Sequence, residues 1–139
     1  MGYGELLHKS GQRTISPAIC VYIDANGLHE LNNERGHEVG DLMLRFVAES
    51  LMEQFPKGSL YRVGGDEFVV FPAPAEGQTC EDRMRSASAS ITAQGYSISY
   101  GIAAHESVVG LRELVREADE KMLESKRAYY AEHDRRVRK

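Results

Sequence analysis

The chain contains few of the features that build disulfide-stabilised or membrane-spanning proteins. It has only two cysteines among 139 residues, and Cys20 and Cys80 do not form a C-x-x-C pair. Because Cys20 lies in an apolar, strand-like stretch, we expect both thiols to be reduced and buried, as in a cytoplasmic protein. No apolar run approaches the ~18 residues of a membrane span, and the N-terminus has no signal-peptide pattern, so we expect a soluble chain.

Positive charge is also scarce. The chain carries 17 lysines and arginines against 21 acidic residues, which gives a formal net charge of −4. A general nucleic-acid binder needs a basic face to neutralise backbone phosphates, so the composition argues against that class of protein. A small anionic substrate needs only local positive groups and a metal ion.

Length and composition fit one folded domain. With 42% hydrophobic residues the chain can form an ordinary core, and it contains no internal repeat or low-complexity linker. We therefore expect a single domain over residues 1–139, with a shortened N-terminal lead over 1–17 and a basic tail over 131–139. The run from Arg135 to Lys139 either touches an anionic partner or membrane surface or forms a solvated tail.

Two adjacent carboxylates, Asp66 and Glu67, follow a pair of glycines between two apolar runs. The runs at 59–63 and 68–71 are rich in β-branched and aromatic residues, which predicts two strands. We expect Gly64-Gly65 to supply the positive φ angles of a tight hairpin. Acidic side chains at a hairpin tip are placed to hold a metal ion. The alternative is a hairpin whose charges are only solvated.

Hydrophobic periodicity predicts the element order βαββαβα. A short apolar strand ends at Asp24, a helix ends before Pro56, and the hairpin is followed by a helix over about 80–93, a strand over 96–102 and a final helix. This order suits the ferredoxin-like α+β class, with helices on one face of an antiparallel sheet. That topology puts the first strand beside the third, so we expect Asp24 and Asp66 to meet.

Four ordered stretches resemble the motifs of one bacterial family. The segment from Asp24 to Asp41 is similar to D-x-[DN]-x-[FL]-K-x-[IL]-N-[DN]-x-x-G-H-x-x-G-D, and the GGDEF run at 64–68 follows it. The stretch 97–103 is similar to a strand ending S-x-G-I-A, and 117–122 with Lys126 is similar to an A-D-x-x-[LM] helix with a phosphate-binding lysine. The chain is thereby identified as a member of the GGDEF family, whose domains resemble class III nucleotide cyclases and polymerase palms and condense two GTP into cyclic di-GMP.

The resemblance implies a two-metal catalytic site. Asp24 and Asp66 would bind Mg²⁺ through their carboxylates, the Ala25 carbonyl would add a backbone ligand, and Glu67 would complete the site or assist deprotonation. Mn²⁺ is an alternative ion, and the roles of Asp66 and Glu67 are not divided further. Such hard ions prefer oxygen ligands, and two of them about 4 Å apart can stabilise the entering and leaving oxygens of phosphoryl transfer.

The resemblance also implies where GTP lies. The loop that includes Gly27 and Leu28 opens a short helix whose backbone N–H groups can face the triphosphate, and Lys126 would add a positive charge from the last helix. By itself Lys126 would be an ordinary solvated lysine. Because each subunit supplies one GTP, the resemblance implies a homodimer for catalysis and a sensor domain upstream, while we expect the isolated domain to be a monomer.

Asn32 and Asp41 match residues that contact guanine in the family. A carboxylate can accept from guanine N1–H and N2–H₂ but faces adenine N1, itself an acceptor, so Asp41 favours GTP over ATP and disfavours a cyclase for another nucleotide. The alternative for Asp41 is a helix N-cap. We expect His37 to be a turn or packing residue, because no second histidine lies at ligand spacing.

Several positions depart from the family pattern. The opening D-x-L-T-G-L-x-N-R segment is absent, His29 stands where a lysine is usual, and Tyr130 stands where an arginine commonly binds phosphate. Phe55 and Gly58 replace the arginine and aspartate of the R-x-x-D inhibitory site, so we expect no product inhibition there. The intact acidic residues favour a diguanylate cyclase. The departures favour the alternative, a catalytically weak or inactive module that binds GTP as a regulatory ligand or serves as a dimerisation partner.

Overall fold

The computed structural model describes residues 1–73 and 79–137, with side chains as far as residue 132. Four strands form one antiparallel sheet in the order β3-β4-β2-β5. They are β2 (Ala18–Ala25), β3 (Ser59–Arg62), β4 (Glu67–Phe71) and β5 (Ile98–His105). The first of these strands along the chain lies beside the third, which confirms the predicted α+β topology.

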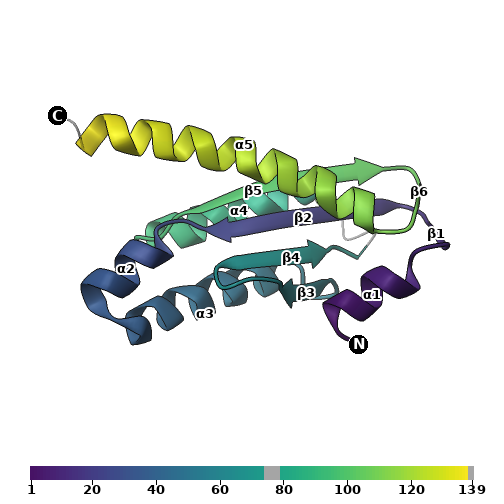
Figure 1. Cartoon of the computed structure of the whole chain (residues 1–139), viewed down its shortest axis with the longest axis horizontal. Helices are drawn as coiled ribbons and strands as arrows, with labels where there is room; N and C mark the ends of the chain where they lie inside the picture. The colour runs from purple at the N-terminus through teal and green to yellow at the C-terminus, as the bar shows by residue number, and fades with distance from the viewer. Residues whose placement is uncertain (74–78, 138–139) are drawn as a thin grey trace.

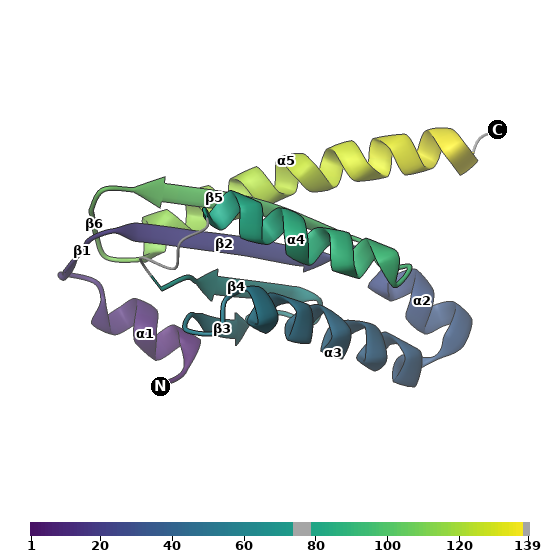
Figure 2. The same ribbon diagram turned by 180° about the vertical axis from the view of Figure 1, so that it is seen from behind.

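Helices α3 (His37–Gln54) and α4 (Cys80–Ala93) cover one face of this sheet (Figure 2). Val21, Ile23 and Ala25 alternate along β2 and are buried under these helices, as the two-residue period of a strand requires. The buried apolar residues of α3 recur every three or four positions and are Met43, Leu44, Val47 and Leu51.

Helix α5 (Arg112–Val137) lies across the opposite face, together with α1 (Tyr3–Lys9) (Figure 1). The other alternate residues of β2, Ala18 and Cys20, are buried there against α5 residues such as Ala118. The expectation of helices on one face is therefore wrong. β2 is apolar on both faces, and a helical stripe does not specify which face of a sheet it covers.

Gly101 allows α5 to approach the sheet closely. A Cβ at Gly101 would collide with the backbone carbonyl of Ala118 and the backbone nitrogen of Met122. β5 and α5 thus meet main chain to main chain, which only a residue without a side chain permits. None of the described helices, α5 included, is both long and apolar enough to cross a lipid bilayer.

The N-terminal residues are attached to the start of α5. A two-stranded sheet joins β1 (Thr14–Ile15) to β6 (Val108–Val109). The N–H of Gly110 donates to the carbonyl of Arg13 at 2.9 Å. Residues 1–17 are therefore part of the folded domain, although their elements are too short for periodicity to reveal.

A break at Gly36 separates α2 (Leu28–Arg35) from α3. Gly36 has a φ of 87°, and α3 begins at the next residue, His37. Asp41 therefore lies inside α3, a turn beyond its start, and the alternative in which Asp41 caps this helix is wrong. At the other end of the chain α5 continues to Val137, and the side chains of the basic run 135–139 lie outside the described residues.

Candidate functional site

The end of β2 meets the start of β4. Asp24 lies directly opposite Glu67 in the antiparallel pairing, and the N–H of Ala25 donates to the carbonyl of Asp66 at 2.8 Å. The predicted meeting of Asp24 and Asp66 is thus confirmed at the level of the backbone. Three acidic residues share this edge of the sheet, and Asp24 is more than forty positions from the adjacent Asp66 and Glu67 along the chain.

The turn before Asp66 is held by a side chain rather than by left-handed glycines. Arg62 donates to the carbonyl of Gly64 at 3.3 Å and to that of Gly65 at 2.7 Å, while Val63 N–H donates to Glu67 O. Neither Gly64 nor Gly65 has a positive φ, so the expectation of a tight two-glycine turn is wrong. The Val63–Glu67 pair encloses three residues, and such a loop does not require the geometry of a two-residue turn.

Asp24 is the most deeply buried acid at this edge, with only 1% of its surface exposed. Its Oδ2 accepts a hydrogen bond from Lys126 Nζ at 2.7 Å, whereas its buried Oδ1 has no partner among the described residues. Burial raises the pKa of Asp24 to about 6, although the hydrogen bond from Lys126 lowers it; the Asp66 and Glu67 carboxylates add to the increase. The site therefore holds negative charge at a cost, and a cation would relieve that cost.

Lys126 comes from α5 and reaches Asp24 across the sheet face. The hydrogen bond to Asp24 raises the pKa of Lys126, so its ammonium stays charged beside the carboxylate. No pattern in the sequence indicates this pairing, because none specifies that α5 crosses the face on which Asp24 lies. In this structure the ammonium occupies the position of a counter-cation at the acidic edge.

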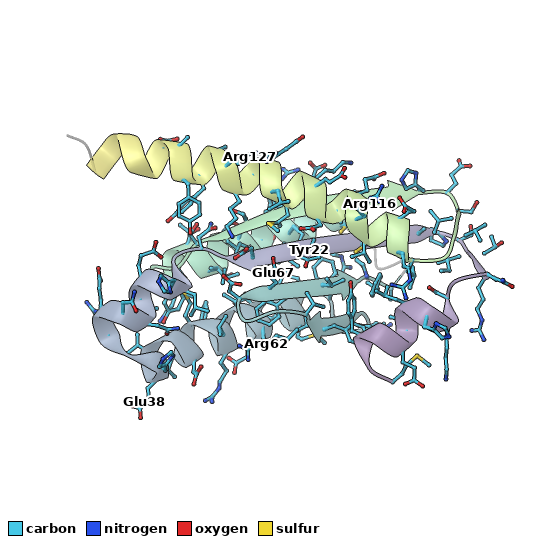
Figure 3. The ribbon with its side chains drawn as sticks, in the orientation of Figure 1. Tyr22, Glu38, Arg62, Glu67, Arg116 and Arg127 are labelled. Carbon is cyan, nitrogen blue, oxygen red and sulfur yellow. The ribbon has the colours of Figure 1, made fainter. Side chains whose placement is uncertain are left out.

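Glu67 has a partner that the sequence analysis missed. Its Oε1 accepts a hydrogen bond from the hydroxyl of Tyr22 at 3.2 Å, and Figure 3 shows the two side chains on the neighbouring strands β2 and β4. Burial and the Glu67 charge both raise the pKa of Tyr22, which keeps the phenol protonated. The spacing along the strand could have indicated this contact, because Tyr22 lies two residues before Asp24 and therefore on the same face of β2.

The loop between β2 and α2 is anchored at two points. Asn26 is buried; its side-chain amide donates to Ser97 Oγ, and its side-chain carbonyl accepts from Ser99 Oγ, both at 3.0 Å. Gly27 adopts a left-handed φ of 76°, and its N–H donates to the hydroxyl of Tyr130 at 3.4 Å. A tyrosine of α5 thus pairs with one of the backbone N–H groups predicted to face a triphosphate.

The two predicted guanine-binding residues have different surroundings. Asn32 on α2 has a buried Oδ1 with no hydrogen-bond partner in the part of the chain that the structure describes, and a side chain at Gly40 would fill the same space. Asp41 is exposed on α3 and lines a hollow of about 520 Å³ that also includes Arg62 and Phe68 but not Asn32. Leu28, also predicted to contact substrate, packs partly into the core.

The described residues contain no ready-made metal cluster. No three His, Cys, Asp or Glu side chains in this part of the chain are gathered closely enough to hold a metal by themselves. Metal binding by Asp24, Asp66 and Glu67 therefore stays a prediction. Two features fit it: carboxylate oxygens are the ligands that Mg²⁺ prefers, and the buried Oδ1 of Asp24 lacks a partner.

The corner at the start of β3 contrasts with this acidic edge. Phe55 is 1% exposed, and the guanidinium carbon of Arg83 lies 5.8 Å from the centroid of its ring. At Gly58, a Cβ would lie 3.1 Å from the carbonyl oxygen of Phe71. Phe55 is therefore part of the hydrophobic core, and Gly58 is in close contact with the backbone of the neighbouring strand.

Comparison with known proteins agrees with this architecture. A family model described as diguanylate cyclase, GGDEF domain, matches residues 4–131. The diguanylate cyclase DgcS of Shewanella oneidensis is 30% identical over 122 residues, which cover 83% of this chain and 41% of the relative. The probable diguanylate cyclase DgcI of Escherichia coli is 32% identical over 115 residues, 78% of this chain and 25% of the relative.

A solved structure shares the fold. The GGDEF domain of PA1120 from Pseudomonas aeruginosa matches with a TM-score of 0.67 and 27% identity, over 89% of this chain and 78% of that one. The chain spans less than half the length of the two curated relatives. Because the family model covers nearly the whole sequence and the motifs lie at the junction of β2 and β4, the chain belongs to the GGDEF domain family.

Proposed function

We propose that this domain is a diguanylate cyclase, which converts two GTP into cyclic di-GMP and two pyrophosphates. The observation that carries the proposal is the buried Asp24, whose Oδ1 has no partner although the charges of Asp66 and Glu67 act on it. Burying a charge with an unsatisfied oxygen is costly, so proteins retain this arrangement mainly where a ligand uses it.

The oxygen ligands for Mg²⁺ or Mn²⁺ would be the carboxylates of Asp24 and Asp66, the carbonyl of Ala25 and, at the edge of the site, Glu67. Bound there, two such ions supply charge neutralisation at the α-phosphate and lower the pKa of the ribose 3′-hydroxyl. Asp24 would then no longer need the ammonium of Lys126. We propose that Lys126 transfers from Asp24 to a phosphate oxygen when nucleotide and metal enter together.

The phosphate end of GTP would lie at the start of α2. The backbone N–H groups of Gly27 and Leu28 open this helix, and its dipole favours an anion there. Lys126 and Tyr130 are one helical turn apart on α5 and both reach this region, since Lys126 contacts Asp24 and Tyr130 contacts Gly27. The phosphate site would thus be closed by one cation and one neutral hydroxyl.

Guanine would be read by Asn32 and Asp41. The unpaired Oδ1 of Asn32 can accept a hydrogen bond, and the exposed carboxylate of Asp41 can accept from guanine N1–H and N2–H₂. Because Asp41 does not cap α3, its carboxylate has no structural duty at the helix start that competes with a ligand. This supports GTP as the substrate.

Cyclisation would require two domains. Each 3′-hydroxyl attacks the α-phosphate held by the other subunit, so the two sites must face each other across a two-fold axis. The relatives extend well beyond the matched region, and a sensor domain outside this segment would bring the two copies together. Feedback through an R-x-x-D site would be absent, because Phe55 and Gly58 offer neither a guanidinium nor a carboxylate.

A direct assay tests the proposal. Purified protein incubated with GTP and Mg²⁺ should form cyclic di-GMP at a rate that rises with the square of protein concentration while dimers are scarce. Asp24→Ala and Asp66→Ala should each lower turnover at least about a hundredfold, because a metal ligand is lost. Glu124→Ala, which removes an exposed carboxylate of α5, is the matched control and should retain the parental rate.

A non-catalytic GTP-binding module is the second candidate. It is favoured by the neutral Tyr130 at the phosphate site and by the pairing of Lys126 with Asp24. Fusion of the domain to a dimerising coiled coil distinguishes the two candidates, because it makes the encounter intramolecular. GTP binding without any cyclic product from the fused protein would establish the module and reject the cyclase.

A further inference from the structure

Glu67 is held by its diagonal neighbour across the sheet. In the β2–β4 pairing Glu67 lies opposite Asp24, and Tyr22 lies opposite Val69. The hydrogen bond of 3.2 Å nevertheless runs from the Tyr22 hydroxyl to Glu67 Oε1. Diagonal pairs of this kind are within reach of a long aromatic side chain. One oxygen of Glu67 is thereby fixed beside Tyr22.

Gly64 leaves room for the same oxygen. A Cβ at Gly64 would lie 3.0 Å from Glu67 Oε1, which is tighter than ordinary contact, while Glu67 Cβ would lie at an ordinary 3.5 Å. Gly64 does not have a positive φ, so the backbone does not demand a glycine at this position. At Gly65, by contrast, a Cβ would meet nothing within 4 Å. The absence of a side chain at Gly64 therefore leaves room for the Glu67 carboxylate.

We propose that Tyr22 and Gly64 are positioning residues for Glu67, an inference that rests on the proposed function. Tyr22 donates to Oε1 and Gly64 provides the space, so Oε2 is directed to the acidic edge that Glu67 shares with Asp24. Without this support the carboxylate would be free to adopt other rotamers, driven by repulsion from Asp24 and Asp66. Partners behind a metal ligand commonly change metal affinity or activity about 10- to 100-fold.

The first test compares two tyrosine variants. Tyr22→Phe removes the hydroxyl and keeps the ring. Tyr61→Phe makes the same change on β3, where the ring contacts Tyr3 and Phe71 and the hydroxyl forms no hydrogen bond within the described residues. We expect Tyr22→Phe to weaken Mn²⁺ binding, measured by titration without nucleotide, about tenfold, while Tyr61→Phe matches the parent. Equal affinities for the two variants would overturn the proposal.

The second test compares two glycines. Gly64→Ala places a methyl group 3.0 Å from Glu67 Oε1, so that the carboxylate must shift, and should weaken Mn²⁺ binding, whereas Gly65→Ala meets open space and should not. In Tyr22→Phe combined with Gly64→Ala, the losses should be smaller than their sum, because both act on one carboxylate. Additive losses, or equal effects at Gly64 and Gly65, would contradict a shared role.

A third measurement does not depend on metal or on catalysis. The ¹³C signal of the Glu67 carboxyl carbon in metal-free protein should shift in Tyr22→Phe and stay in place in Tyr61→Phe. An unchanged Glu67 signal in Tyr22→Phe would reject the positioning role even if the protein binds no metal. A shifted signal in a protein that makes no cyclic di-GMP would support the positioning role and reject the proposed activity.

Discussion

The two ends of β3 have very different surroundings. At the C-terminal end of β3, Arg62 holds the turn that places Asp66 and Glu67 near the buried carboxylate of Asp24. Before its first residue, Phe55 is packed in the core and Gly58 lies against the backbone of Phe71. The end near Asp24 has neighbouring carboxylates that repel one another. The end near Phe55 is filled by an apolar core residue.

This difference shows that the two ends of one strand can favour opposite kinds of side chain. Polar groups at the acidic edge destabilise the free protein, and such a cost is typical of functional sites. At the start of β3 the substitutions contribute to the core, and burying an aromatic ring stabilises the fold. The comparison predicts that changes at the two ends will have opposite effects on stability.

The largest effect is expected from restoring polar residues at the Phe55 corner. Phe55→Arg would bury a charge where an aromatic ring is packed, and we expect the free energy of unfolding to fall by about 3–5 kcal/mol, measured by urea denaturation. Glu53→Arg, on the exposed surface of α3, is the control and should change it little. A stable Phe55→Arg/Gly58→Asp variant that binds cyclic di-GMP would refute the view that packing closes this corner.

At the acidic edge, Asp24→Asn should stabilise the protein in a pH-dependent way. The folded state raises the pKa of Asp24 to about 6 from an ordinary value of 3.8, so folding binds protons between these values and stability declines as pH rises through them. Asn removes this penalty. Above pH 6 the variant should gain roughly 1–3 kcal/mol in chemical denaturation, and near pH 3 the gain should vanish. A variant less stable than the parent at pH 7 would show that the Lys126 contact outweighs burial.

The effect expected on the choice between GTP and ATP is similar to or smaller than the effect of Asp24→Asn on stability. Asp41→Ser should reduce the preference for GTP over ATP by roughly 1–3 kcal/mol, because a hydrogen-bonded discriminator is lost. Titrations with both nucleotides measure the ratio. Thermal stability should stay close to that of the parent, since Asp41 does not cap α3. An unchanged ratio of affinities would remove Asp41 from the base site.

The smallest effect is expected at Tyr130. Tyr130→Arg would add a cation near Gly27 and should tighten GTP binding about two- to tenfold, and the gain should shrink in high salt. Tyr130→Phe removes the hydroxyl without adding charge and shows whether the bond to Gly27 matters. Weaker GTP binding by the arginine variant would mean that the phenol, rather than a charge, suits the bound phosphate.

The sequence predicted the order of the main elements and the meeting of Asp24 with Asp66, because strand and helix periodicities are strong in these segments. It did not predict α5 on the second face, since a stripe such as Leu114 and Ala118 is compatible with either face. It also assigned positive φ to the wrong glycines. The turn at Gly64 is longer than two residues, and among the described residues the left-handed glycines are Gly27, Gly36, Gly95 and Gly110.

Contacts between distant side chains were the least predictable part of the candidate site. The ion pair of Lys126 with Asp24 and the bond of Gly27 to Tyr130 join residues more than 100 positions apart. Both depend on the angle at which α5 crosses the sheet, which no local pattern encodes. For Asp41 the start of α3 after Gly36 excludes the helix cap, and contact with guanine stays a prediction.

The backbone contact at Gly101 determines how accurately Lys126 is placed. At Ala118 and Met122 the backbone of α5 packs directly on the backbone of β5. Such a contact has little freedom to adjust, unlike a layer of side chains that can change rotamer. Lys126 begins only one helical turn beyond Met122, about 6 Å along the axis. The backbone contact thus holds the position of α5 on the sheet. The flexible side chain of Lys126 then determines which positions its amino group can reach.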